Sequence, residues 1–139
     1  MAEKIFLKHI EDAGLSEQVR VSSAGTDGWH AGDEADPRTN AVLCEHGYPT
    51  GHSAAKVSRD HLDADLVVPL DTGHDRILAR LGVPTERRRL LRSFDPETDS
   101  DSVADPYYGP DSEFETVREQ IEAAVPGLMD WVNDALGRR

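Results

Sequence analysis

Hydrophobic positions at the beginning of the chain recur with the period of a helix. They are Ala2, Ile5, Phe6, Ile10 and Ala13, at i, i+3, i+4, i+8 and i+11, with Glu, Lys and Asp on the opposite face. The pattern predicts an amphipathic helix that starts at the first residue. No side chain precedes it to cap the first amides, and the chain's ammonium group lies at the positive end of the helix dipole. We therefore expect that a segment before this helix is missing.

The next part of the chain carries a strand pattern and then a helix pattern. Residues 19–24 alternate between apolar and polar and stop at Gly25, as in a strand. Asp36 and Pro37 are typical of an N-cap followed by proline at the first helical position. The apolar positions that follow predict a helix that ends at Gly47.

Strand and helix patterns continue to alternate in the second half. Residues 66–70 form a short apolar run, as expected of a buried parallel strand, and a helix is predicted at 73–81. Residues 89–94 predict a weaker third strand. A long loop over 95–112 precedes a terminal helix that we expect to bend at Pro126.

The order of these elements is αβαβαβα, which predicts an α/β fold with a doubly wound parallel sheet and right-handed crossovers. Units of this kind normally begin with a strand, so the first helix lacks its partner. With 139 residues, of which 37% are hydrophobic, we expect one domain over residues 1–139.

Charge and cysteine content narrow the classes of partner. Fifteen Lys and Arg stand against 27 Asp and Glu, a net charge of -12, which argues against nucleic acid or an anionic membrane. A single cysteine excludes an intrachain disulfide and any Cys-rich zinc site, and fits the cytoplasm. The histidines show no paired metal-ligand spacing, so we expect neither a metal nor a cofactor.

Five short stretches carry the most informative combination of residues. They are Ser23-Ala24-Gly25-Thr26, Trp29-His30-Ala31-Gly32, Asp36-Pro37-Arg38, Ser93-Phe94-Asp95-Pro96 and Asp105-Pro106-Tyr107-Tyr108-Gly109. In this order and spacing they resemble the low-molecular-weight protein tyrosine phosphatases, over the whole chain. The resemblance implies a monomeric enzyme that hydrolyses aryl phosphate monoesters of phosphotyrosine proteins through a cysteinyl-phosphate intermediate.

Asp105 is the candidate general acid, because hydrolysis of an aryl phosphate requires a group that protonates the departing phenolate. Pro106 favours an extended conformation at the residue before it. Tyr107 and Tyr108 could form a slot for a flat aromatic ring, opposite Trp29. We expect these three aromatic residues to bind substrate.

The other half of the catalytic machinery is absent from this sequence. Family members carry a first strand and a C-x5-R-S loop with a following proline immediately before the Met-Ala-Glu stretch. The resemblance therefore implies a sheet of about four strands whose first, central strand is missing, with marginal stability or association through the exposed sheet. Cys44 does not replace the nucleophile, because it lies inside a predicted helix as a buried or half-buried residue, and Thr50 stands where the motif needs arginine.

Three interpretations remain open. The chain is a phosphatase whose sequence begins too late, a catalytically dead module that binds phosphotyrosine segments or another protein, or a truncated product without function. We favour the first and expect the chain as given to be inactive. Arsenate reduction, a sibling activity on this type of fold, is disfavoured because it relays electrons through additional cysteines.

Overall fold

The computed structural model describes residues 1–25, 37–51, 55–98, 100–103 and 111–137. This part of the chain forms five α-helices and two short 3-10 helices. They are α1 (Ala2–Asp12), α2 (Pro37–Glu45), α3 (Arg59–Leu62), α4 (Thr72–Arg80), η1 (Thr85–Arg87), η2 (Leu91–Phe94) and α5 (Asp111–Gly137). None of the described helices has the combination of length and hydrophobicity that crossing a bilayer requires.

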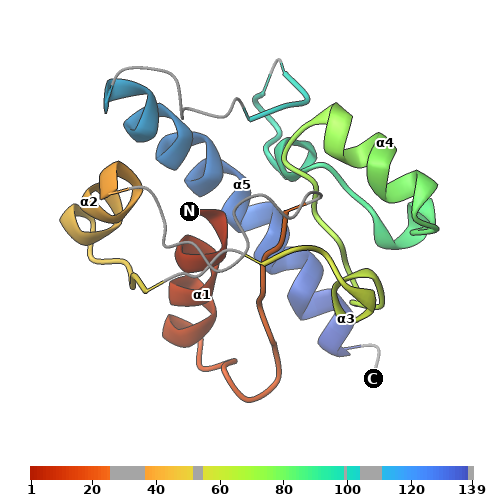
Figure 1. Ribbon diagram of the computed structural model, residues 1–139. Coiled ribbons are helices and arrows are strands. Elements are labelled where there is room, and N and C mark those ends of the chain that lie inside the picture. Colours follow the sequence, from red (N-terminus) through yellow and green to blue (C-terminus); the bar gives the residue numbers. More distant parts are fainter. Residues whose placement is uncertain (26–36, 52–54, 99, 104–110, 138–139) are drawn as a thin grey trace.

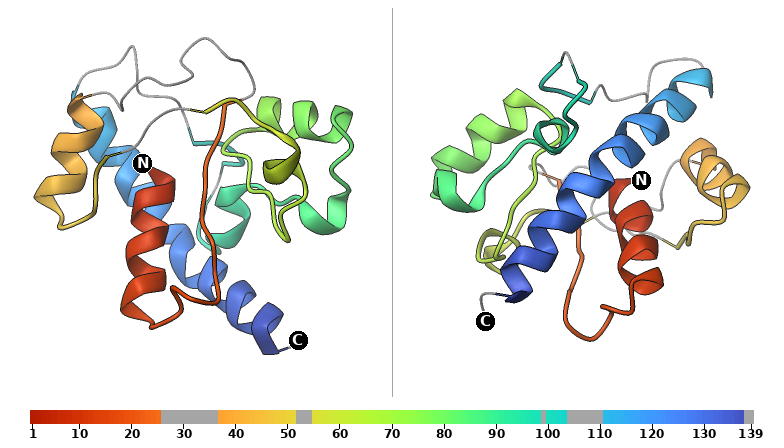
Figure 2. Two further views of the ribbon diagram at one scale, coloured as in Figure 1. Left: turned by 60° about the horizontal axis from the view of Figure 1, so that its bottom comes forward. Right: turned by 180° about the vertical axis from the view of Figure 1, so that it is seen from behind.

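Helix α5 is the centre of the molecule. It packs against α1, α2 and η2. Figures 1 and 2 show it as a long diagonal rod, with α1 and α2 to one side and α3 and α4 to the other. The core lies along this helix, with contributions from α1, α2 and η2. Its buried members are Ile5, Leu43, Leu91, Phe94, Val103, Val117, Ile121, Ala124, Val125 and Leu128.

The predicted first helix is confirmed, including its uncapped start. Ile5 and Ile10 are completely buried, as the apolar stripe requires. Met1 occupies the N-cap position without a side-chain hydrogen bond. Burial lowers the pKa of the Met1 ammonium group, which lies in the interior of the molecule near α5 (Figure 1).

The other predicted helices are confirmed within one or two residues of their ends. Helix α2 begins at Pro37, the position where proline loses no hydrogen bond. Helix α4 begins at Thr72 after Asp71, whose Oδ1 accepts a hydrogen bond from the His74 backbone N–H at 2.7 Å. Pro126 lies inside α5. The short helices α3 and η1 were not predicted, because each is only about one turn long.

The predicted parallel sheet is not confirmed by the described residues. Residues 19–24 and 66–70 are extended but form no named strand, and residues 91–94 are the 3-10 helix η2 instead of the end of a strand. Two isolated parallel bridges are present, one between Gly25 and Lys56 and one between Val67 and Arg88. A strand is defined by pairing, so an apolar run without enough neighbours cannot become one.

One side of the 66–70 segment is paired. The Val67 N–H donates to Arg87 O at 2.7 Å, and the Arg89 N–H donates to Val67 O at 3.2 Å. The Leu91 N–H donates to Pro69 O at 3.0 Å, which continues the register. The third predicted strand, at 89–94, is thus not confirmed: residues 87–91 make only a short parallel contact before the chain turns into η2.

Candidate active site

The four residues expected to act on substrate lie outside the described part of the chain. Asp105, Tyr107 and Tyr108 belong to the segment 104–110, and Trp29 belongs to the segment 26–36. Their assignment stays a prediction. The structure describes the elements from which both segments start and to which they return.

The segment that contains Trp29 starts from a backbone contact. The Gly25 N–H donates to Ala55 O at 2.7 Å, and the Val57 N–H donates to Gly25 O at 2.8 Å. Gly25 is thus held on both its donor and its acceptor. At its other end the segment leads directly into α2, whose first residue is Pro37.

The segment that contains Asp105 starts beside the end of the 66–70 run. The buried residue Val103 donates its N–H to Leu70 O at 2.7 Å. The hydroxyl of Ser102 accepts from the Thr72 N–H at 3.3 Å, which ties the same stretch to the first turn of α4. The segment then leads into α5 at Asp111.

The segment 26–36 therefore leaves from the carboxyl end of the stretch 19–25, and the segment 104–110 starts beside the carboxyl end of the stretch 66–70. In an open α/β fold, ligands bind at this edge. The site at this edge stays a prediction, because the residues expected to act on substrate lie outside the described ranges.

Arg92 helps to hold the start of the segment that contains Asp105. Its Nη1 donates to Ser102 O at 3.3 Å. Its Nε is buried and has no hydrogen-bond partner among the described residues. The sequence predicted only a strand at Arg92. The hydrogen bond from Arg92 to Ser102 joins two separate segments of the chain, and a local sequence pattern does not reveal such a contact.

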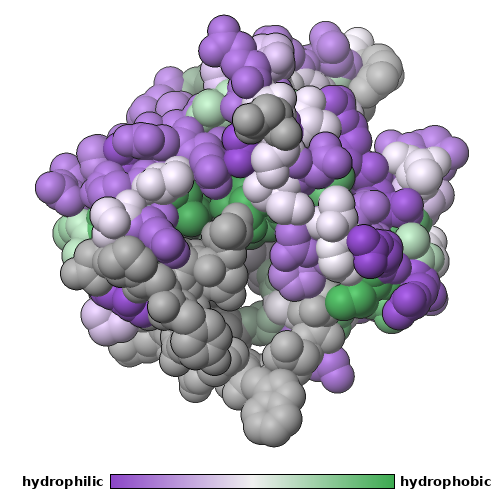
Figure 3. Space-filling view, turned by 90° about the horizontal axis from the view of Figure 1, so that it is seen from above, coloured by the Kyte–Doolittle hydropathy of each residue, from purple (hydrophilic) through white to green (hydrophobic). Residues whose placement is uncertain are grey.

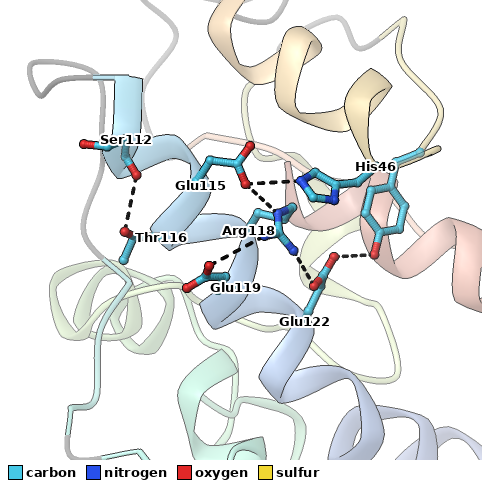
Figure 4. Close-up of polar contacts among 8 residues, drawn as sticks. His46, Ser112, Glu115, Thr116, Arg118, Glu119 and Glu122 are labelled. Atoms are coloured by element: carbon cyan, nitrogen blue, oxygen red, sulfur yellow. Dashed lines mark hydrogen bonds and ion pairs between the residues drawn. The ribbon is translucent and has the colours of Figure 1, made fainter.

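A polar network fastens the C-terminal end of α2 to α5 (Figure 4). The Tyr48 hydroxyl donates to Glu122 Oε1 at 2.6 Å, and His46 Nε2 lies 3.2 Å from Glu115 Oε2. Arg118 links the two carboxylates, with Nε 2.9 Å from Glu115 Oε2 and Nη1 2.6 Å from Glu122 Oε2. The network sets the position of α2, to which the Trp29 segment returns.

These contacts shift the pKa values of the groups involved. Burial and the hydrogen bond to Glu122 raise the pKa of Tyr48 to about 12. The hydrogen bond from Arg118 lowers the pKa of Glu115, and the one from His46 acts in the same direction. Burial alone would lower the pKa of Arg118, but its hydrogen bonds to Glu115 and Glu122 raise it.

Three groups of this region could present metal ligands. One ligand atom each of Glu45, His46 and Glu115 lies within 4.8 Å of the others. Histidine spacing could not reveal this set, because Glu45 and His46 lie at the end of α2 and just after it, whereas Glu115 lies in α5, far along the chain. Glu115 Oε2 already accepts from Arg118 and faces His46, and exposed acidic groups gather in this way without an ion. We assign no metal to it.

The single cysteine is not placed for nucleophilic catalysis. Cys44 lies in α2 directly after the buried residues Val42 and Leu43 and is exposed. The expectation of a buried or half-buried side chain was wrong, because the helix turns position 44 away from the core face that its two neighbours occupy.

Comparisons with known proteins identify the family. The family model for low molecular weight phosphotyrosine protein phosphatase matches residues 1–138. The "Low molecular weight protein-tyrosine phosphatase A" of Mycobacterium bovis is 53% identical over 140 residues, covering 99% of this chain and 86% of the relative. The low molecular weight protein-tyrosine-phosphatase of Streptomyces coelicolor is 49% identical over 147 residues, covering 100% of this chain and 88% of the relative.

Solved structures agree with this result. The protein tyrosine phosphatase of Entamoeba histolytica superposes with a TM-score of 0.89 at 25% identity, covering 96% of this chain and 88% of that chain. YfkJ from Bacillus subtilis superposes with a TM-score of 0.88 at 28% identity, covering 96% and 86%. The chain belongs to the low molecular weight phosphotyrosine protein phosphatase family.

Proposed function

We propose that this family member hydrolyses aryl phosphate monoesters, with phosphotyrosine-containing proteins as its substrates. The observation that carries the proposal is the family match over residues 1–138. It is supported by the way in which Val103 and α5 hold the two ends of the segment that contains Asp105. No cofactor is needed for this chemistry.

In the proposed reaction, a thiolate attacks the phosphorus atom and the bond to the phenolate oxygen breaks. Asp105 donates its proton to the departing phenolate and becomes a carboxylate. It then takes a proton from water, which attacks the cysteinyl phosphate, releases inorganic phosphate and regenerates the thiolate. Trp29, Tyr107 and Tyr108 form the walls that orient the aromatic ring.

We propose further that residues 1–139 alone do not carry out this reaction. The reaction needs a cysteine of low pKa in a loop whose backbone amides and arginine bind the phosphate dianion. Cys44 lies in a helix, and the position that the motif would reserve for arginine is Thr50. Residues 1–139 thus contain the proposed acid, Asp105, and no cysteine that fits the motif of the nucleophile.

The first experiment measures turnover of p-nitrophenyl phosphate by residues 1–139 and by the Cys44→Ser variant. Neither should be active. Turnover by the parent chain that Cys44→Ser abolishes would show that this cysteine is the nucleophile and would contradict the proposal. Binding of a phosphotyrosine peptide without turnover, even after the extension described next, would favour the binding-module interpretation.

The second experiment restores the missing chemistry. The chain is extended at Met1 by a strand and a C-x5-R-S-P loop of the pattern that the family resemblance implies. The extended chain should hydrolyse aryl phosphates, and Asp105→Asn should lower kcat by a factor of about 10² to 10⁴. The loss should be larger for phenyl phosphate than for p-nitrophenyl phosphate, because a poorer leaving group depends more on the acid. Asp101→Asn, an exposed carboxylate of the same loop, is the matched control.

A further inference from the structure

The first turns of α2 and α5 meet at a contact between two side chains. The Cζ atom of Arg38, the second residue of α2, lies over the ring of Phe114, 4.4 Å from the ring centroid. Phe114 belongs to the first turn of α5 and has 2% exposure. A guanidinium group this close to the face of an aromatic ring is attracted by the ring quadrupole. The contact therefore joins the start of α2 to a side chain that the core already holds.

Arg38 occupies a position that helix electrostatics disfavours. It lies at the positive end of the α2 dipole, and the first turn of α2 contains no acidic residue. A neutral side chain or a carboxylate would suit this place better. Proteins break such local rules mainly at functional sites. The contact with Phe114 is the feature of the fold that Arg38 gains at this position.

Arg38 also differs from the arginines of the protein surface. Hydrophilic side chains form most of the described surface that Figure 3 shows from above. Arg76 and Arg80 of α4 are exposed, as is typical of charged residues that face water. Arg38 is half-buried and lies against an aromatic side chain of another helix. We therefore interpret it as a contact between two helices.

Helix α2 is fastened to α5 at both of its ends. Just beyond its C-terminal end, the Tyr48 hydroxyl donates to Glu122 at 2.6 Å, whereas Arg38 contacts Phe114 at its N-terminal end. At 1.5 Å per residue, the two partners on α5 are about 12 Å apart along the helix axis. Figure 2 shows α2 beside the N-terminal half of α5 in both views. Two separated contacts fix the direction of α2 as well as its place.

The two segments that carry the candidate site residues return to the Arg38–Phe114 contact. The segment 26–36 ends directly before α2, and the segment 104–110 ends directly before α5. Arg38 is thus two residues beyond the first segment, and Phe114 is four residues beyond the second. The contact between these side chains sets the separation of the two return points.

We propose that Arg38 is a positioning residue of the candidate active site. By holding the first turns of α2 and α5 together, it sets the separation between Trp29 on one segment and Asp105 on the other. In the proposed reaction the aromatic ring of the substrate lies between these segments. Arg38 therefore controls the fit of the ring and the proton transfer to the phenolate without touching the substrate. The inference rests on the proposed function, which assigns these roles to the two segments.

The first experiment uses residues 1–139 and needs no turnover. Trp131→Phe leaves Trp29 as the only tryptophan, so quenching of its fluorescence by acrylamide reports on the segment 26–36. In this background, Arg38→Met removes the guanidinium group and should raise the quenching constant. Arg80→Met is the matched control, because Arg80 is an exposed arginine of α4, and it should leave the constant unchanged. An unchanged constant in Arg38→Met would overturn the proposal.

The second experiment measures the kinetics of the extended chain. Arg38→Met should lower kcat/KM for phenyl phosphate by about 10- to 100-fold, and by less for p-nitrophenyl phosphate, whose better leaving group depends less on the acid. The inhibition constant of inorganic phosphate should not change, because phosphate has no ring to fit. Arg80→Met should behave like the parent. A rise in the phosphate inhibition constant that matches the loss of kcat/KM would place Arg38 at the phosphate and contradict a positioning role.

Two further variants separate stacking on the ring from charge. Arg38→Lys keeps the positive charge and loses the planar group, so its kcat/KM should lie closer to that of Arg38→Met than to that of the parent. Full activity of Arg38→Lys would assign the effect to charge alone and count against the proposal. Phe114→Leu removes the ring, and adding Arg38→Met to it should cause no further loss. If Phe114→Leu fails to fold, Arg38→Lys decides.

The two experiments also separate this proposal from the proposed function. If the extended parent chain shows no turnover, the proposed function fails, and the quenching of Trp29 in residues 1–139 still decides whether Arg38 positions its segment. If the extended parent is active and Arg38→Met has the same kcat/KM as Arg80→Met, the proposed function stands and Arg38 is not a positioning residue.

Discussion

The half of the molecule built from α1, α2 and α5 and the half around the segments 19–24 and 66–70 differ in the burial of their side chains and in the hydrogen bonding of their backbone. Around α5, side chains of α1 and α2 are fully buried, as Ile5 and Leu43 show with 0% and 1% exposure. In the segments 19–24 and 66–70, by contrast, Leu66 and Val68 are half-buried, and residues 20–24 make no backbone hydrogen bond with other described residues. The two regions therefore differ in how far their side chains are buried and their backbone groups are hydrogen-bonded among the described residues.

The difference follows from where each kind of element finds its hydrogen bonds. A helix satisfies its backbone within its own residues, so α1 forms even without an N-cap. An extended segment satisfies its backbone only through a neighbour, and an unpaired buried N–H costs about 1–3 kcal/mol. Helical parts of a fold can therefore form where a sheet lacks a neighbouring strand.

The largest test compares the same substitution in the two regions. Leu43→Ala removes a side chain with 1% exposure and should lower the free energy of unfolding by about 2–5 kcal/mol. Leu66→Ala, at a half-buried position of the 66–70 segment, should lower the free energy of unfolding by about half as much, because part of the Leu66 side chain already contacts water. Urea denaturation measures both. Equal costs would mean that the two regions are equally packed.

The second test adds volume where α5 and η2 meet. A Cβ on Gly127 would clash with the backbone oxygen of Phe94, so Gly127→Ala should destabilise by about 1–3 kcal/mol. Gly137→Ala on the same helix meets no atom within 4 Å and should be neutral or stabilising by up to about 1 kcal/mol. Thermal unfolding of the two variants would contradict the packing described here if they shifted Tm alike.

The third test concerns α4, the helix that follows the 66–70 segment. Asp71→Ala removes the side chain that caps α4 and should cost about 0.5–2 kcal/mol. Asp71→Asn keeps an oxygen at the same place and should cost little. If chemical denaturation shows that both variants lose the same stability, the charge of Asp71 matters and the cap hydrogen bond does not.

The smallest test removes one contact of the network on the helical side. Tyr48→Phe deletes the hydrogen bond to Glu122 and should cost about 0.5–1.5 kcal/mol at neutral pH. Because the pKa of Tyr48 is raised to about 12, its contribution is full below pH 10 and is lost as the pH rises toward 12. The two proteins should therefore converge in stability over this range, as urea titrations at several pH values would show. A constant difference would exclude the titration of Tyr48 as its cause.

Sequence patterns predicted the helices well because their signals are local. Pro37 marks the start of α2 as the N1 preference predicts, and Asp71 caps α4 from the preceding residue. Strands were predicted from equally local signals, but the described residues show only two bridges, since pairing depends on neighbours that alternation cannot supply. The parallel sheet stays a prediction for this chain.

The candidate site was predictable only in part. Asp105, Trp29 and the two tyrosines came from short motifs and stay predictions, since they lie outside the described residues. The contact of Tyr48 with Glu122 joins residues 74 positions apart, and no periodicity reveals such a pair. The prediction placed Cys44 correctly in a helix but wrongly on its buried side. Residues 42–44 are all apolar enough for the core, so the sequence did not show which of them is exposed.

Helix α5 follows in the chain every element that it covers. During synthesis, at about 5–20 residues per second, the apolar faces of α1 and α2 therefore leave the ribosome several seconds before residues 111–137 exist to cover them. The nascent chain must remain open, or be held by a chaperone, until its last helix arrives. Folding of this domain is in this respect a post-translational event.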